Sequence, residues 1–145
     1  MTDTTPYSSC VTAIETMWSN GWDSDTPYIW QHNSDDPVPS VYSTDYWLHL
    51  AVEFEDERAV AFGQGSFNVE RELRGVVVVR VFGARGVGET TILSLLDQAL
   101  VVFRSQTATG LSFIGTMPLL QPGASEDGSW WIRSAIAPFV YRFRG

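Results

Sequence analysis

Residues Phe67 to Phe82 read FNVERELRGVVVVRVF, and this stretch sets the expected architecture of the whole chain. Within it, Val76–Val79 is apolar at every position, whereas a strand with one face in water alternates apolar and polar residues. We therefore predict a long central strand that is covered on both faces. Gly75 interrupts the stretch, which predicts a bend or a β-bulge at that point.

Further strands are expected before and after this central one. Tyr46 to Phe54 alternates apolar and polar residues, which predicts a half-buried strand. Its polar face ends in three acidic residues at alternate positions, Glu53, Glu55 and Glu57. Trp130 to Phe143 also alternates, and Pro138 within it marks a bulge or an edge because proline has no N–H for the ladder. Shorter strands are predicted at Tyr28–Trp30 and Leu111–Met117.

Two amphipathic helices are predicted, at residues 5–21 and at Glu89 to Arg104. Cys10 falls on the apolar face of the first helix, which indicates a small core residue and not a nucleophile. The second helix has a core stripe at helical spacing, made of Ile92, Leu95, Leu96, Ala99, Val102 and Phe103. Leu93 and Leu100 widen its apolar arc beyond one face, which indicates a second packing surface.

The order of these elements is helix, strands, long strand, helix and strands. Such an order predicts an α+β fold, with two helices packed on a mainly antiparallel sheet. The length suits one domain, and we expect residues 1–145 to form a single one.

Charge is distributed unevenly along the chain. Residues 1–57 carry 11 of the 17 acidic side chains and no basic one, whereas all nine basic residues, every one an arginine, lie in residues 58–145. If the two parts do not mix on folding, the domain has faces of opposite potential, which favour head-to-tail contact between copies. Arginine also pairs with carboxylates in bidentate geometry. The expected interface with partners consists of Glu53, Glu55, Glu57, Arg71, Arg74, Arg80, Arg85, Leu93 and Leu100.

The composition argues against several classes of function. A net charge of −8 disfavours DNA or an anionic membrane as the main ligand, and no apolar run approaches the roughly 18 residues of a membrane-spanning helix. One cysteine cannot form an internal disulfide, and the N-terminus lacks the basic and apolar segments of a signal peptide. We expect a soluble protein of the intracellular type.

Residue patterns typical of enzymes and metal sites are absent from the sequence. Cys10, His32 and His49 do not have the spacing of a zinc site, and neither histidine lies near a recognisable nucleophile motif. We therefore expect no catalytic residue, no metal and no cofactor, and we predict that the protein is not an enzyme.

One loop is close to a phosphate-binding loop. Residues 83–90, GARGVGET, lie between a predicted strand and a predicted helix and match the spacing of that motif at every position but one. Glu89 stands where a lysine contacts the β- and γ-phosphates, and the chain contains no lysine at all. Because a carboxylate repels phosphate, we interpret these residues as a glycine turn from strand into helix.

The layout of the chain resembles a known family. A short first helix precedes an extended stretch with Trp30-Gln31-His32-Asn33, and a glycine-containing hairpin around residues 63–65 precedes the long strand. Arg85-Gly86-Val87-Gly88 then leads into the second helix. The final strand begins after Gly128-Ser129 and ends with Tyr141-Arg142-Phe143-Arg144. From about residue 7 to residue 144, this layout is similar to the tail terminator (tail completion) proteins of long-tailed bacteriophages and of phage-like particles such as gene transfer agents.

The resemblance implies a structural role. Such a subunit forms a ring, expected to be a hexamer, on the head-proximal end of the tail tube, where it stops tube polymerisation. The implied partners are further copies of the chain, the tail tube protein, and a head–tail connector or stopper protein. DNA would pass through the channel without sequence-specific binding. The implied location is the tail of a virion or phage-like particle, and the bacterial cytoplasm during assembly, with no cofactor and no catalytic residue.

Two alternatives from other classes stay open on the sequence. The first is a tail tube or head–tail adaptor ring protein of the same kind of particle. The second is an α+β domain that binds a small molecule in an apolar pocket. The aromatic residues for such a pocket would be Trp22, Trp30, Trp47, Trp130 and Trp131.

We predict that the loop at residues 83–90 binds no nucleotide, because Glu89 replaces the required lysine. Calorimetric titration with ATP and Mg²⁺ should show no heat of binding. Micromolar affinity that disappears when Gly88 is replaced would refute this interpretation.

Overall fold

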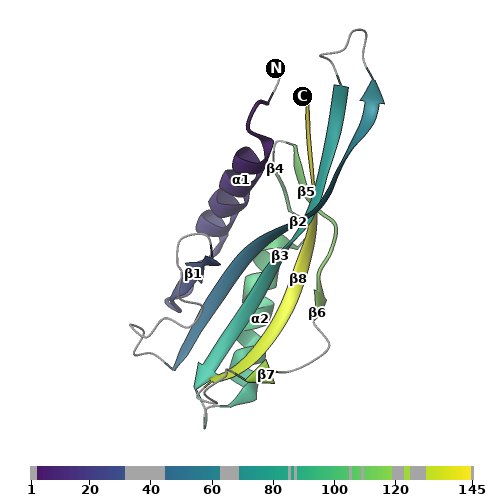
Figure 1. Cartoon of the computed structure of the whole chain (residues 1–145). Helices are drawn as coiled ribbons and strands as arrows, with labels where there is room; N and C mark the ends of the chain where they lie inside the picture. The colour runs from purple at the N-terminus through teal and green to yellow at the C-terminus, as the bar shows by residue number, and fades with distance from the viewer. Residues whose placement is uncertain are drawn as a thin grey trace.

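The chain is described by a computed structural model, which covers residues 3–31, 45–62, 69–84, 86, 88–104, 106–108, 110–118, 123–124 and 130–144. Two helices pack on one curled, mostly antiparallel sheet, so the predicted α+β class is confirmed (Figure 1). The elements in chain order are α1 (Pro6–Gly21), β1 (Tyr28–Trp30), β2 (Tyr46–Phe62), β3 (Val69–Ala84), α2 (Glu89–Phe103), β4 (Thr107–Ala108), β5 (Leu111–Phe113), β6 (Met117–Pro118), β7 (Gly123–Ala124) and β8 (Trp130–Arg144).

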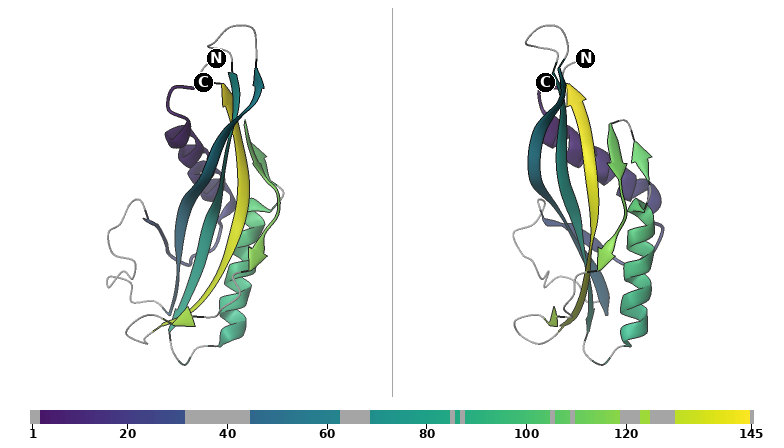
Figure 2. Two further views of the ribbon diagram at one scale, coloured as in Figure 1. Left: turned by 45° about the vertical axis from the view of Figure 1, so that its right-hand side comes forward. Right: turned by 90° about the vertical axis from the view of Figure 1, so that its right-hand side faces the viewer.

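The sheet is built around three long strands. Its strand order is β1-β2-β3-β8-β5-β4, and the short strands β6 and β7 also pair with β8. β3 lies between β2 and β8 and is antiparallel to both, while β1 pairs with β2 in parallel. Figure 2 shows that the three long strands twist together and that α1 and α2 cover the same side of them.

β3 is central and buried on both faces, as its valine run predicts. Val77 and Val79 point into the main core between the sheet and the two helices. Val76 and Val78 lie on the opposite face of the sheet, called the outer face below, in a smaller cluster with Ala51 and Ile136. All four valines are buried. The absence of polar alternation in this segment therefore reflects two separate apolar contacts.

The helices contribute the apolar faces that their sequences predict. Cys10, Ile14 and Trp18 of α1 are fully buried, and the whole predicted stripe of α2 is buried too. Leu100 is also buried in the main core. At Leu100, the second packing surface that its position predicts therefore lies inside the subunit, and this side chain is not exposed to a partner. Leu93, in contrast, is 43% exposed.

The bulge expected at Gly75 lies in the neighbouring strand. The register of β2 against β3 shifts between Phe54 and Asp56, directly beside the pair that Phe54 forms with Gly75. A Cβ atom on Gly75 would lie 2.3 Å from the backbone oxygen of Glu53 and 2.7 Å from Cζ of Phe139. Gly75 is therefore required because a backbone atom and a core aromatic ring approach it too closely for a side chain.

Pro138 lies at a point where β8 has a paired residue on one side only, which is a local form of the expected edge position. Pro138 pairs with Val76 of β3 in regular register, without a bulge. On its other side, β5 ends with Phe113 opposite Phe139, and β6 begins with Met117 opposite Ile136. Proline thus occupies the interval between two short strands, where its missing N–H leaves no gap in a ladder.

We predict that Gly75→Ala lowers the free energy of unfolding by about 3 kcal/mol, because the added methyl group meets backbone and a packed ring. Gly88→Ala is the control, since a Cβ there has open space around it, and it should cost less than about 1 kcal/mol. Urea unfolding with an unchanged slope measures both changes. Equal effects of the two substitutions would contradict the packing argument.

Candidate interaction surface

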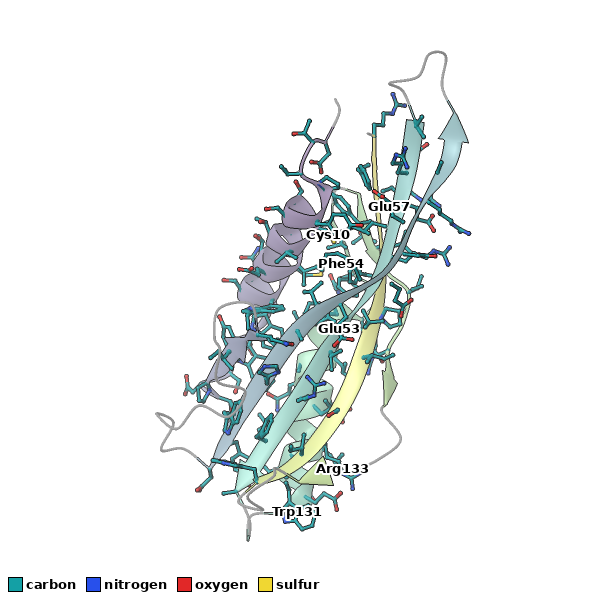
Figure 3. All side chains as sticks on the ribbon, in the orientation of Figure 1. Cys10, Glu53, Phe54, Glu57, Trp131 and Arg133 are labelled. Carbon is teal, nitrogen blue, oxygen red and sulfur yellow. The ribbon has the colours of Figure 1, made fainter. Side chains whose placement is uncertain are left out.

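The three acidic residues expected on one strand face do not share a face in the structure. Glu53, Glu55 and Glu57 are all exposed. Glu53 pairs with Val76 on the outer face, whereas Glu57 pairs with Leu73, which points into the main core on the helix side. The bulge at Glu55 adds one residue and so reverses the alternation beyond it. Figure 3 labels Glu53 and Glu57 on either side of this point.

The arginines expected to form one partner surface are also divided. Arg74 and Arg80 alternate with Val76 and Val78 and therefore lie on the outer face, whereas Arg71 lies on the helix side. Arg85 is outside the described residues. A single surface that combines Arg71 with Arg74 and Arg80 does not exist in this subunit, because a strand alternates its side chains between two faces.

Three arginines surround one buried carboxylate on the outer face. Glu72 is 2% exposed. Its Oε1 accepts a hydrogen bond of 2.5 Å from Nε of Arg74 and one of 3.2 Å from Nη2 of Arg58. Its Oε2 lies 3.4 Å from Nη2 of Arg142. The hydrogen bond from Arg74 and the positive charges of Arg74 and Arg58 hold the pKa of Glu72 below its usual value against the opposing effect of burial.

Among the described residues, the arginines form ion pairs with glutamates that also lie in residues 58–145. Arg58, Arg74 and Arg142 contact Glu72, and Arg133 contacts Glu89. The expected pairing of Arg74 with acids of the first 57 residues is therefore replaced, within one subunit, by pairing with Glu72. Glu55 and Asp56 add only a weaker electrostatic effect on Arg74, whose pKa is raised mainly by Glu72.

The loop close to a phosphate-binding motif has a different environment. β3, which leads into it, is antiparallel to both of its neighbours. Glu89 lies in the first turn of α2 and forms an ion pair with Arg133 of β8. Figure 3 labels Arg133. The lysine position of the motif therefore holds a carboxylate that is paired with an arginine, as expected of a structural turn.

Cys10 and His49 are both buried within the subunit. Burial raises the pKa of the Cys10 thiol to about 12, so the reactive thiolate is scarce at neutral pH. Burial, and then the charge of Arg80, lower the pKa of His49, whose Nδ1 is buried without a hydrogen-bond partner. His32 is outside the described residues. In the described part of the chain, no group of three His, Cys, Asp or Glu side chains could hold a metal ion.

A groove of about 850 Å³ lies between α1, α2 and β4. Ala13 and Met17 of α1 and Val101 and Val102 of α2 form part of its apolar lining, and Thr107 and Ala108 of β4 border it. Val101 is 56% exposed.

None of the described helices is long and apolar enough to cross a membrane.

Tryptophan residues do not line this groove, so the pocket expected for a small-molecule-binding domain is not formed there. Trp30 is buried in the main core, and Trp22 stacks on Trp18 at 4.8 Å between ring centroids. Trp47 stacks on Phe82 at 3.9 Å on the outer face. The indole rings of Trp22, Trp30 and Trp47 thus pack in two separate regions on opposite sides of the sheet, whereas Trp131 is 45% exposed.

The two edges of the sheet, which are its outermost strands, carry exposed side chains of opposite charge. Beyond Leu50, the described part of β2 has no strand on the side away from β3, since β1 pairs only with Leu48–Leu50. This acidic edge carries the exposed residues Glu53, Glu55, Asp56 and Glu57. The opposite side is formed by β4 and by the end of β8. This arginine edge carries the exposed residues Arg104 and Arg144, and the backbone oxygen of Arg144 accepts a 2.8 Å hydrogen bond from the N–H of Asp3.

Comparisons with known proteins identify the fold. No protein-family model matches the chain, and no curated protein matches it. A solved structure that bears no functional name has a TM-score of 0.58 and 17% sequence identity, with 94% of this chain and 95% of that chain covered. A chain of the "Virion of native gene transfer agent (GTA) particle" has a TM-score of 0.41 and 15% identity, over 83% of this chain and 80% of the other. The first likeness shows a shared fold, and the second is too low to show one.

We predict that Glu72→Gln destabilises the folded chain by about 2 kcal/mol at neutral pH, because three arginines lose their anionic partner. The lowered pKa adds a pH dependence: the contribution of Glu72 is complete above 4.5, its usual pKa, and is lost as the pH falls through the lower pKa of the folded state. Unfolding free energies measured across this range should therefore converge for the two proteins at low pH.

Asp97→Asn is the control for this comparison, since Asp97 is an exposed residue of α2. Its effect at neutral pH should stay within about 0.5 kcal/mol. A constant difference between Glu72→Gln and the parent protein, down to the lowest pH, would show that the carboxylate charge is not what stabilises the cluster.

Proposed function

We propose that this protein is a tail terminator of a phage-like particle, a structural subunit and not an enzyme. The supporting observation is the order of elements, which the sequence resemblance requires and which the described residues reproduce. A first helix, α1, precedes β2, and β2 pairs in antiparallel fashion with β3. β3 leads into α2, and the long strand β8 closes the chain beside β3. The resemblance extends over about residues 7–144, so we treat the whole chain as one domain of this kind.

In the proposed role, copies of the chain form a ring, a hexamer by the resemblance, on the head-proximal end of the tail tube. The ring stops polymerisation of the tube protein and offers a surface to a head–tail connector or stopper protein. The place of action is the tail of a virion or of a gene transfer agent, reached from the bacterial cytoplasm during assembly.

The electrostatics of the outer face support a passive relation to DNA. Arg58, Arg74 and Arg142 contact Glu72, and Arg133 contacts Glu89, so four of the nine arginines contact a carboxylate within the subunit. A chain of net charge −8 gains little from phosphate neutralisation. DNA that passes through the ring would therefore meet a surface without sequence-specific contacts.

We predict that deletion of the gene from the particle-producing host leaves overlong tails, or heads without attached tails, because nothing stops the tube or joins it to the head. Electron microscopy of the lysate measures tail lengths and the fraction of joined particles. A plasmid copy of the gene should restore both. Particles of normal tail length in the deletion strain would refute the terminator role.

The same microscopy separates the alternative ring proteins. A tube subunit would polymerise into an open tube when purified, and its deletion would remove the tube altogether. A terminator should instead form self-limiting rings. A chain that stays monomeric and binds a small molecule would favour the remaining alternative.

A further inference from the structure

We propose that copies of this chain join sheet edge to sheet edge, with the acidic edge of one copy lying along the arginine edge of the next. β2 of one copy would thereby add a strand beside β4 of its neighbour, in the manner of β-strand addition. The inference rests on the proposed ring and specifies the contact that would hold the ring together.

The acidic edge has the backbone needed for such a contact. β2 runs from Tyr46 to Phe62, yet β1 pairs with it only at Leu48–Leu50. Among the described residues, the segment from Ala51 to Phe62 therefore has a strand partner on one side only. A long strand with one open side presents unpaired N–H and C=O groups, which proteins either protect or use for pairing with another chain.

The carboxylates of this edge have no described cation as an ion-pair partner. Glu53, Glu55, Asp56 and Glu57 take part in none of the ion pairs formed between described residues. The bulge directs Glu53 and Glu57 to opposite faces, so negative charge surrounds the edge from both sides. Four acidic groups within five positions repel one another, and a basic partner would relieve this repulsion.

The opposite edge supplies matching positive charge. Arg104 follows α2 and is exposed. The side chain of Arg142 is 61% exposed but contacts Glu72 of β3, on the side of β8 away from β4, so the charge of this edge comes from Arg104 and Arg144. The backbone N–H of Arg142 donates a 2.8 Å hydrogen bond to the oxygen of Gly110, which places the end of β8 beside the turn between β4 and β5. Arg144 lies on the same face of the sheet as Arg142.

Apolar contact is available where the added strand would lie. Exposed ion pairs contribute only about 0.2–1 kcal/mol each, so charge alone cannot hold a ring together. The groove beside β4 offers Met17 and the exposed Val101. On β2, Val52 and Ala59 are half-buried in the single subunit. Because each copy has one edge of each kind, the contact is heterologous and repeats around a ring.

The test exchanges the charges of the two edges. Variant one carries Glu55→Arg and Glu57→Arg, and variant two carries Arg104→Glu and Arg144→Glu. Each variant alone places like charges at every contact, so the protein concentration at half-assembly should rise at least about tenfold. An equimolar mixture of the two should assemble near the wild-type concentration, with the variants alternating. Light scattering after size exclusion and negative-stain microscopy read out the assembly.

A control pair shows whether position or net charge matters. Thr90→Arg with Asp97→Arg adds positive charge at two exposed sites of α2 that do not line the groove. This variant should assemble like the wild type, and mixing it with variant two should not rescue variant two. Wild-type assembly by both edge variants would overturn the inference and leave the terminator role standing. A wild-type chain that stays monomeric at about 100 μM would overturn the ring itself.

Cross-linking tests the same contact without changing charge. Cys10 is the only cysteine and is fully buried, so engineered thiols react against a clean background. A short bismaleimide should link a chain with Ala59→Cys to a chain with Thr107→Cys, and neither variant should link to itself. Dimers formed by one variant alone would indicate a two-fold contact and would contradict the edge-to-edge arrangement.

Discussion

The antiparallel pairing of β3 with both β2 and β8 is the constraint on which the rest of the molecule depends. This ladder places Gly75 between the backbone of Glu53 and the ring of Phe139, with no room for a side chain. It also assigns one set of valines to the helices and the other set to the outer face. Both helices can then pack on one side of the sheet, because only that side carries the larger apolar surface.

The bulge in β2 shows how one extra residue changes the chemistry of a surface. Without it, Glu53, Glu55 and Glu57 would form a stripe on the outer face, as strict alternation predicts. With it, Asp56 lies opposite Arg74, and Arg58 lies opposite Glu72. Arg58 therefore reaches the buried Glu72 only because the register shifts just before it, whereas Arg74 and Arg142 reach Glu72 from β3 and β8.

The sequence was sufficient for those features that depend on local periodicity. The central strand, both helices, the buried Cys10 and the α+β class follow from apolar spacing alone, and the structure confirms each of them. Features that depend on register could not be predicted, since a bulge is set by packing between strands and not by residue type. The separation of Arg71 from Arg74 followed directly from strand alternation and could have been predicted. The burial of Leu100 could not be predicted from the helix pattern, since it depends on how α2 packs within the folded subunit.

In the folded chain, the uneven charge of the sequence lies mainly along the edges of the sheet. In the described part of the chain, Arg58, Arg74 and Arg142 pair with a glutamate of their own half, and the acids of β2 form no ion pair with a described residue. Folding does not produce two charged faces, because strand alternation mixes charges across each face. The asymmetry survives at the two edges of the sheet, where backbone groups can pair as well. A charge pattern located at strand edges can set both the direction and the register of a contact between copies, which a charged face cannot do alone.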